Sequence, residues 1–422
     1  MKDKKAEQSW QSLAFIWVGS KISVPGLLLG GTLVAGMPFW QAILASLVGH
    51  AVIVLGMVLQ GIQSSDLKRP TVQVASQVFG EQGAQKLIAI ILAISCLGWF
   101  GLQANVAGEA FSQFLTLYNV AFPVWLSSLC WGTVMLLSAI FGVKILSWLN
   151  YIAVPFLLAV VIYAMAISVA DGGWSAVMNY QPETHMPFLS GVSVSIGSFA
   201  LGAIIAGDYS QYVRNRSGVA KASIVGVLPA GLLMIAAGAI FGVTSATADI
   251  TSVFSQLGMP VIGVIAMLLA TWTTNAVNAF SGGIAIVNVF NVSKEKQTLA
   301  VAAAGGIGTI LAAIGILDYF VPIMNVLSAM IPPVAGVMIA SYWLIQKGDP
   351  DNWYEVAGIN WLGVISWFIG ATVATLPVIL EFFPNAPKLI NQPLIGVILS
   401  FIIYYGAYKI TAKKAVNKNI DD

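Results

Sequence analysis

Twelve long apolar runs constrain the fold of this 422-residue chain more than any other feature. A helix needs roughly 20 mostly apolar residues to cross a bilayer, and helices are the structures that satisfy their own backbone in hydrocarbon over such lengths. Only 9% of the residues are charged, against about 25% in soluble domains, so the missing polar surface must face lipid. The sequence therefore predicts an all-α polytopic membrane protein without a separate soluble domain. The predicted spans are 12–35, 38–62, 86–114, 122–142, 144–170, 188–207, 222–243, 259–290, 297–317, 319–345, 358–380 and 393–412.

The basic residues predict the orientation of these spans. With the N-terminus in the cytoplasm, seventeen of the 19 Lys and Arg residues fall on the cytoplasmic side, as the positive-inside rule requires. Only Lys388 falls on the outer side, and Lys21 lies within the first span. The polar start, Met1–Ser9, leads into an apolar run without a small-residue cleavage site, so we expect no cleaved signal peptide. We predict a multi-pass protein of the bacterial cytoplasmic (inner) membrane with both termini cytoplasmic.

Two of the predicted spans contain helix-breaking sequences at equivalent positions. The first contains Ser23-Val24-Pro25-Gly26, and the sixth contains Gly197-Ser198-Phe199-Ala200-Leu201-Gly202. Proline removes a helix hydrogen bond and glycine relaxes the backbone, and transporters often build midplane sites from such broken helices. The offset of five spans predicts one transporter domain with a five-plus-five inverted repeat, in which 12–170 and 188–345 are the repeats and 358–412 adds two helices. Helix packing is the alternative explanation, because Gly and Pro are common in membrane helices.

Aromatic and amide side chains lie at similar depth in the third, sixth and eighth spans. Trp99 and Gln103 are four residues apart and share a helix face, and Phe199 lies about 17 Å into its span at 1.5 Å per residue. Two aromatic rings suit the faces of a flat heterocycle, and the amides of Gln103 and Asn275 suit its edge. Ser23, Ser198 and Gly202, at the two interruptions, and Cys96, three residues before Trp99, complete the predicted substrate site.

Thr273 and Thr274 place two hydroxyl groups deep in the eighth span. Polar groups at this depth must be paired or face a cavity, and they serve helix packing equally well. Together with carbonyls released by the broken first helix, these hydroxyls form an oxygen set without a full negative charge. Such a set suits a weakly held Na⁺ as the coupling ion.

Other function classes find no support in the sequence. Cys96 and Cys130 lie in apolar runs and indicate neither a disulfide framework nor a metal site. The spans contain no nucleophile–base pair or metal cluster of the kind that a membrane enzyme needs, so we predict a transport protein and not an enzyme. The basic residues follow topology, which argues against nucleic-acid binding, and no obligatory protein partner is evident. The predicted partners are a small heterocyclic substrate, Na⁺ or H⁺, and the lipid bilayer.

Four short motifs resemble the nucleobase:cation symporter-1 family, with the bacterial cytosine permeases as the closest branch. They are Gly98-Trp99-Phe100-Gly101, Gly197-Ser198-Phe199, Trp272-Thr273-Thr274-Asn275 and Ser328-Ala329-Met330-Ile331-Pro332-Pro333. The resemblance implies a leucine-transporter-like fold, Na⁺ symport and alternating access. It also implies that Trp99 and Phe199 stack on the substrate and that Asn275 binds it. The Na⁺ site implied by the resemblance combines carbonyls of Gly19 and Ile22 with Ala270, Thr273 and Thr274.

The sequence departs from the cytosine permease pattern at positions near the predicted substrate. The family places a glutamine three residues before the tryptophan, where this chain has Cys96, and Leu201 replaces a second polar residue. Gln103 resembles the hydantoin transporters instead. The prediction is a Na⁺-coupled importer of a nucleobase-like heterocycle, cytosine or a related pyrimidine or purine. The alternative is a proton-coupled importer of a hydantoin-like ring or a thiamine-precursor pyrimidine, with Lys21 as the proton carrier, because an intramembrane lysine is a functional candidate.

Overall fold

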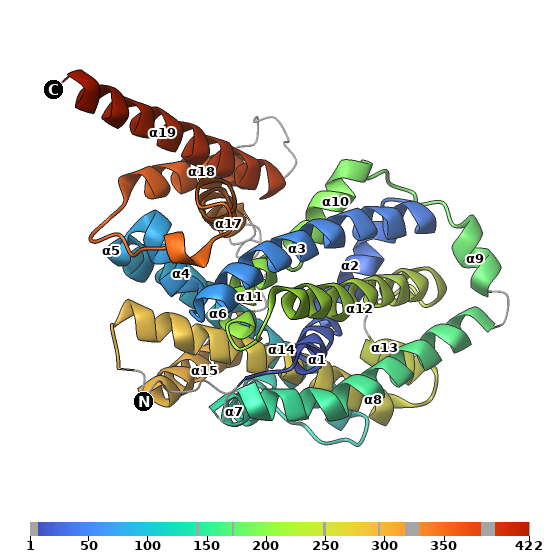
Figure 1. Ribbon diagram of the computed structural model, residues 1–422. Coiled ribbons are helices and arrows are strands. Elements are labelled where there is room, and N and C mark those ends of the chain that lie inside the picture. Colours follow the sequence, from blue (N-terminus) through green and yellow to red (C-terminus); the bar gives the residue numbers. More distant parts are fainter. Residues whose placement is uncertain are drawn as a thin grey trace.

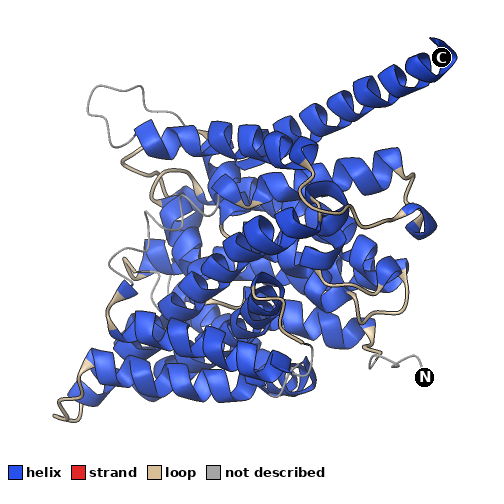
Figure 2. Cartoon of the chain, turned by 90° about the vertical axis from the view of Figure 1, so that its left-hand side faces the viewer, coloured by secondary structure: helices blue, strands red, loops and turns tan. Residues whose placement is uncertain are grey.

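The described part of the chain is built almost entirely from helices (Figure 2). A computed structural model describes residues 7–140, 143–170, 173–247, 250–293, 296–316, 329–380 and 393–421. Within these ranges the extended structure is a single bridge between Gln8 and Val213. Residues 319–328 of the predicted tenth span, including Ser328 of the fourth motif, lie outside the described ranges.

Long apolar helices dominate the structure. Among the described residues, seven spans are long and apolar enough to cross a bilayer, and an eighth forms if α1 and α2 count as one. Their helices are α1 (Trp10–Lys21), α2 (Val24–Val34), α3 (Phe39–Leu67), α5 (Glu81–Gly83), η1 (Ala84–Ile88), α6 (Ala89–Thr116), α8 (Val143–Ala170), α10 (Phe188–Gly197), α11 (Ala200–Ser210), α12 (Arg216–Thr244), α14 (Pro260–Val289) and α19 (Pro393–Asp421).

Shorter helices complete the bundle. Four apolar segments of 10–17 residues fall within other predicted spans: α7 (Val124–Ile140), α15 (Gln297–Ala313), α17 (Pro332–Ile339) with η4 (Ala340–Ile345), and the part of α18 (Trp361–Leu380) that ends at Pro377. The remaining helices connect the longer ones and are α4 (Thr71–Phe79), α9 (Gly173–Asn179), α13 (Ile250–Gln256) and η5 (Pro350–Asn352).

The first predicted span is broken in the structure. Helix α1 ends at Lys21, α2 begins at Val24, and the two axes differ by 54°. Between them Ser23 adopts an extended backbone, with φ of −139° and ψ of 155°. Pro25 follows in the first turn of α2, where its missing N–H costs no helix bond. The break therefore releases backbone groups of α1 that an unbroken helix would engage.

The sixth predicted span is interrupted at Ser198 and Phe199. Helix α10 ends at Gly197, α11 begins at Ala200, and Phe199 leaves the helical region with φ of −142° and ψ of 23°. The amide of Phe199 still donates to the carbonyl of Ile196 at 3.3 Å. This interruption changes the direction of the helix axis less than that of the side chains. The Phe199 side chain therefore points in a different direction from one in a regular helix.

The two interrupted segments lie inside the bundle. Helix α12 packs against α1, α2 and α3, while α14 packs against α6 and also contacts α1 (Figure 1). Helices α17, α18 and α19 form a separate group at one side of the bundle in this view, and α19 projects outward. The central position of α1, α6, α11 and α14 places the sequence-predicted site residues near one another.

Segments predicted to be cytoplasmic meet at one end of the bundle. Arg216 forms an ion pair with Asp66 at 2.8 Å, and the Tyr342 hydroxyl donates to the same carboxylate at 2.5 Å. The backbone N–H of Gln8 donates to the Tyr212 carbonyl at 2.8 Å. These contacts join the end of α3, the start of α12, the segment after α17 and the start of the described chain.

Segments predicted to be external also meet one another. The amide of Met186 donates to the carbonyl of Gly36 at 2.6 Å, and the Thr184 hydroxyl donates to the Ala35 carbonyl at 2.7 Å. The loop before α10 thus lies against the turn after α2. In both sets the contacts join segments that the sequence assigns to the same side of the membrane.

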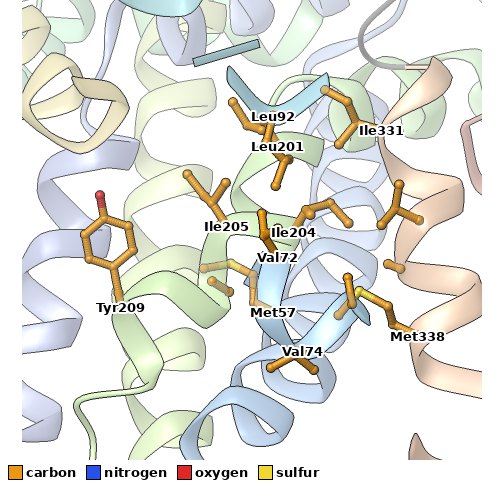
Figure 3. Close-up of a cluster of buried hydrophobic side chains, with 14 of the residues drawn as sticks. Met57, Val72, Val74, Leu92, Leu201, Ile204, Ile205, Tyr209, Ile331 and Met338 are labelled. Carbon is orange, nitrogen blue, oxygen red and sulfur yellow. The ribbon is translucent and has the colours of Figure 1, made fainter. Parts of the chain in front are cut away.

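Helix α11 is held in place by an apolar cluster. Figure 3 shows Leu201, Ile204 and Ile205 of α11 among side chains of α3, α4, α6 and α17, and all of them belong to one buried cluster. The Tyr209 hydroxyl adds a hydrogen bond to the Val277 carbonyl of α14 at 2.8 Å. This packing holds the part of α11 that directly follows Phe199, and it thereby fixes the position of the interruption.

Candidate functional site

A cavity lies where the two interrupted segments face α6 and α14. Seventeen residues line it: Ser20, Lys21, Ser23, Pro25, Gly26, Trp99, Gln103, Gly197, Ser198, Phe199, Ala200, Leu201, Gly202, Ile205, Thr274, Val277 and Asn278. The volume of the cavity that is open to water is about 50 Å³. One water molecule needs roughly 10–15 Å³ of such volume. The cavity therefore has space for several waters or for part of a small ring.

Phe199 and Lys21 occupy one wall of this cavity together. The Lys21 Nζ lies 4.6 Å from the centroid of the Phe199 ring, within the range of a cation–π contact. The ring also rests on Gly202, where a Cβ would come within 2.4 Å of it. Trp17 meets Phe199 edge-on with the ring centroids 6.5 Å apart. A glycine at position 202 thus leaves room for the Phe199 ring, and this room is what Gly202 contributes to the site.

Gln103 is the most unusual polar residue of the cavity. Its side chain is buried, with 1% of its surface exposed, and within the described part of the chain neither its Oε1 nor its Nε2 has a hydrogen-bond partner. A buried amide without partners costs the desolvation of both groups, and most buried polar atoms in proteins are paired. Since Gln103 lines the cavity on the same face of α6 as Trp99, its amide is available to a ligand there.

The structure separates the roles of two asparagines on α14. The Asn275 Nδ2 donates to the Phe100 carbonyl at 2.9 Å, and Asn275 is not among the residues that line the cavity. Asn278 does line it, and its Nδ2 contacts the Asn275 Oδ1 at 3.4 Å. Asn275 therefore supports α6 and α14 against each other, while Asn278 presents an amide to the cavity.

Oxygen atoms of α14 and of the end of α1 gather next to the cavity. The Thr273 Oγ1 lies 2.9 Å from the Gly19 carbonyl oxygen and 3.1 Å from that of Ala270. The Thr274 Oγ1 lies 3.0 Å from the Ala270 carbonyl oxygen and 3.5 Å from that of Ser20. Ile22 follows between α1 and α2, where its carbonyl is released from regular helix bonding. The group combines hydroxyls and carbonyls without a carboxylate.

Gly19 lets α8 approach this oxygen group. A Cβ on Gly19 would lie 1.5 Å from the Oδ1 of Asn150 and 3.4 Å from the Thr273 Cβ. Asn150, on α8, is fully buried. A side chain at position 19 would therefore displace Asn150, and the amide oxygen of Asn150 is a further polar atom close to the carbonyl group of α1.

The other predicted substrate residues have different surroundings. Ser23 and Ser198 line the cavity, but the Ser198 hydroxyl donates to the Ser195 carbonyl at 2.7 Å, and the Ser23 hydroxyl lies 3.4 Å from the Lys21 carbonyl oxygen. Cys96 is buried in the apolar cluster around α11 and does not line the cavity. Trp99, Phe199, Gln103, Ser23, Ser198, Gly202 and Thr274 are thus brought together, and Asn275 and Cys96 lie elsewhere.

Three polar residues near the site were missed from the sequence. Asn278 lies four residues after Thr274 and shares its helix face, so helical spacing was a usable signal. Ser20 contributes a carbonyl and has no signal of its own. Asn150 lies in a predicted span far away along the chain, and only the packing of α8 against α1 brings it to Gly19.

Comparison with known proteins gives a family for this sequence. Residues 1–392 match the model of a family described as permeases for cytosine/purines, uracil, thiamine and allantoin. The match covers the interrupted segments, α6 and α14, and therefore the whole cavity. Permeases are transport proteins, in agreement with the sequence-based prediction of a transporter that is not an enzyme.

Individual relatives agree with this family. The chain is 26% identical over 370 residues to a cytosine permease of Escherichia coli (strain K12), covering 87% of this chain and 86% of the relative. It is also 26% identical over 406 residues to a hydantoin permease of Microbacterium maritypicum, covering 86% and 81%. Both relatives are permeases.

A solved structure shares the fold. It is a nucleobase-cation-symport-1 family transporter in a closed conformation with bromovinylhydantoin bound, with a TM-score of 0.79 and 21% identity over 98% of this chain and 96% of that one. At this identity the likeness concerns the arrangement of the helices. The predicted all-helical transporter fold is confirmed at that level.

Proposed function

We propose, from the premise that this chain belongs to the family of permeases for cytosine/purines, uracil, thiamine and allantoin, that it imports a nucleobase-like heterocycle together with Na⁺. The substrate would bind in the cavity between the interrupted segments and α6 and α14. Cytosine and the related pyrimidines and purines are the proposed class. Import would proceed by alternating access, in which one end of the bundle opens after the other has closed.

The amide of Gln103 is the observation that carries the substrate class. Gln103 lines the cavity, and its Oε1 and Nε2 have no hydrogen-bond partner among the described residues. A heterocycle with adjacent carbonyl and N–H groups would accept one hydrogen bond from Gln103 and donate another. Asn278 would supply a second amide to the same ring edge. The buried Gln103 amide carries a desolvation cost that its present surroundings do not offset. Hydrogen bonds to a bound ring would offset this cost and so favour binding.

Two aromatic residues would hold the faces of the ring. Trp99 and Phe199 both line the cavity and come from α6 and from the interruption of the sixth span. Stacking on two rings favours flat ligands over branched ones of similar polarity. Because the Phe199 ring now covers Lys21, binding would require Phe199 to turn from the lysine toward the ligand.

The oxygen group at the end of α1 would bind the Na⁺. It comprises the carbonyls of Gly19 and Ala270 and the hydroxyls of Thr273 and Thr274, with Ile22 at the helix break. A hard cation prefers oxygen ligands, and hydroxyls that now donate to carbonyls would turn their lone pairs to the ion. Since these atoms join α1 to α14, the ion would hold the two helices together while Thr274 faces the substrate cavity.

Replacing Thr274 by alanine is expected to raise the Na⁺ concentration for half-maximal stabilisation of the purified protein by roughly tenfold, the order of one lost buried interaction. The readout is the melting temperature as a function of Na⁺ without any substrate. Thr133→Ala is the matched control, because Thr133 makes the same bond to the carbonyl four residues earlier but is exposed on α7. An unchanged Na⁺ dependence in Thr274→Ala would place the ion elsewhere.

The proposed transport cycle uses the twelve predicted spans and the five-plus-five inverted repeat. Residues 12–170 and 188–345 would form the repeats, and 358–412 the two additional helices. The protein would lie in the inner membrane of a bacterium, with both termini in the cytoplasm. In this orientation the contacts of Asp66 with Arg216 and Tyr342 would close the cytoplasmic path, and their opening would release the substrate and the ion inward.

Proton coupling is the second candidate, and Lys21 is the observation that favours it. Its side chain is 3% exposed, lines the cavity and is the last residue of α1 beside the oxygen group. A buried lysine that loses its proton in one state of the cycle would carry H⁺ in place of Na⁺. Uptake driven by a proton gradient without Na⁺, and lost in Lys21→Ala, would favour this candidate.

The proposed function is tested by thermal stabilisation of the purified chain with a panel of nucleobases, hydantoins and allantoin, in Na⁺ and in K⁺ at equal ionic strength. A ligand that binds only the folded state raises its stability by mass action. We expect one ring class to stabilise the protein, and more strongly in Na⁺. Equal effects in both salts would argue against Na⁺, and the absence of any ring effect would contradict the substrate class.

A further inference from the structure

The cavity contains a buried lysine, whose ammonium form would bring a positive charge into it. Lys21 ends α1, lines the cavity and keeps 3% of its surface exposed. Its ammonium group contacts the Phe199 ring face at 4.6 Å. A cation–π contact is worth a few kcal/mol at most, whereas removing an ammonium ion from water costs several. The ring alone therefore leaves much of this cost uncompensated.

No acidic residue balances this charge in the described structure. The cavity lining contains neither aspartate nor glutamate, and within the described ranges the ion pair that forms is the one between Arg216 and Asp66. Asp208, the acidic residue of α11, accepts a hydrogen bond from the Thr71 amide at 3.0 Å. It lies nine residues beyond Phe199, about 13 Å along a helix, and is committed to the α3–α4 connection.

His50 is the other ionisable side chain close to Lys21. A Cβ on Gly231 of α12 would touch both the His50 ring and the Lys21 Cε. The His50 Nδ1 lies 2.9 Å from the Ser46 carbonyl oxygen, which only accepts, so this nitrogen carries the proton and donates. The Nε2 then holds a lone pair and has no hydrogen-bond partner among the residues that the structure describes. A neutral imidazole offers Lys21 a dipole but no negative charge.

The proposed coupling ion increases the imbalance. Thr274 and Lys21 line the same cavity, so a Na⁺ on the Thr274 oxygen group would share the wall with the ammonium. Two positive charges in a low-dielectric site repel each other strongly. A neutral substrate would leave both uncompensated, whereas a ligand with one negative charge would pair with Lys21 and reduce the repulsion.

We propose that the substrate is a flat heterocycle carrying one ionised acid group, whose anionic oxygen pairs with the Lys21 ammonium while Gln103 binds the amide edge of the ring. This inference rests on the proposed function and narrows its substrate class. Phe199 leaves the lysine when the anion arrives and turns its face to the ring. Lys21 is then the residue that selects an acidic ring over its neutral parent.

The test compares neutral rings with anionic partners on the purified full-length chain in Na⁺. The pairs are uracil with uracil-6-carboxylate, hydantoin with hydantoin-5-acetate, and hypoxanthine with urate. We expect the anionic member of one pair to bind roughly tenfold or more tightly than the neutral member, the order of a charge-assisted hydrogen bond. Affinity is measured by the ligand concentration that raises the melting temperature.

Two variants assign this preference to one side chain. Lys21→Met keeps the length of the side chain and removes its charge, and we expect it to abolish the preference for the anion while binding of the neutral ring persists. Lys221→Met is the matched control, since Lys221 is exposed on α12, and it should keep the preference. If Lys21→Met does not yield folded protein, the comparison of the paired rings on the unaltered chain decides the question.

Each outcome separates this inference from the proposed function. Tighter binding of the neutral rings, or equal binding within each pair, would overturn the anionic substrate and leave the proposed function standing. Anion preference that survives in Lys21→Met would remove Lys21 from its role. Binding of no ring at all would overturn both. Uptake of a neutral ring driven by a proton gradient and lost in Lys21→Met would assign Lys21 to coupling instead.

Discussion

Replacing Trp99 by alanine is expected to abolish uptake while the protein is still produced and folded. Trp99 lines the cavity on the same α6 face as Gln103, and stacking of a base on an aromatic side chain is worth about 1–3 kcal/mol. Its loss would lower the affinity by roughly ten- to a hundredfold. The position of the ring relative to Gln103 would also be lost, so the amide pairing would weaken too. We expect the same result for Phe199→Ala.

The measurements are uptake of the stabilising ring in cells and its effect on the melting temperature of the purified variant. Trp125→Ala serves as the control, because Trp125 is a tryptophan of α7 that is 56% exposed and is not among the residues that line the cavity. Trp99→Phe, which retains an aromatic face, should restore part of the binding. Normal uptake in Trp99→Ala would rule out stacking on this residue.

Replacing Gly238 by leucine is expected to prevent the accumulation of folded protein. A Cβ on Gly238 of α12 would lie 1.9 Å from the Leu27 carbonyl oxygen of α2, and one on Gly30 would lie 2.2 Å from the Ile235 carbonyl oxygen. These glycines let the two backbones touch, as small residues do between membrane helices. The obstruction is backbone, so a side chain cannot turn aside. Overpacking that forces backbone shifts costs about 1–3 kcal/mol or more.

The expected consequence extends to the cavity, because α2 carries Pro25 and Gly26 of its lining. Gly238→Ala should lower the melting temperature and weaken ligand binding, and Gly238→Leu should yield aggregated protein in size-exclusion chromatography. Gly306→Ala is the matched control, since a Cβ there meets nothing within 4 Å and alanine favours a helix over glycine. A wild-type melting temperature in Gly238→Leu would contradict the close approach of α2 and α12.

The broken helices illustrate what local sequence can predict. Pro25 and the neighbouring glycine cannot continue an α-helix without losing a backbone bond, so a break near Ser23 follows from covalent structure. The structure ends α1 at Lys21 and begins α2 at Val24. At Ser198 and Phe199 no proline marks the break, and the repeat offset was the signal. The 54° bend of the first pair is a property of packing that no local pattern contains.

The asparagines of α14 illustrate what the sequence leaves open. Asn275 follows the threonine pair directly and was predicted to bind the substrate. Its side-chain amide instead donates to the Phe100 carbonyl, and Asn278 lines the cavity. One residue along a helix is a turn of about 100°, so the rotation of α14 decides which amide meets the substrate. That rotation is set by contacts with α6 and α7, far away in the sequence, and with the neighbouring α15.

The sequence by itself determined that this chain is a helical membrane transporter, where its apolar spans lie and where the first of them breaks, because hydropathy, proline and glycine act over a few residues. The tertiary structure alone decided which polar groups face one cavity. It left Gln103 without partners, paired Asn275 within the bundle and placed Lys21 against Phe199. These outcomes depend on helix rotation and on contacts between distant segments, which fix whether a buried polar group is satisfied by the protein or remains for a ligand.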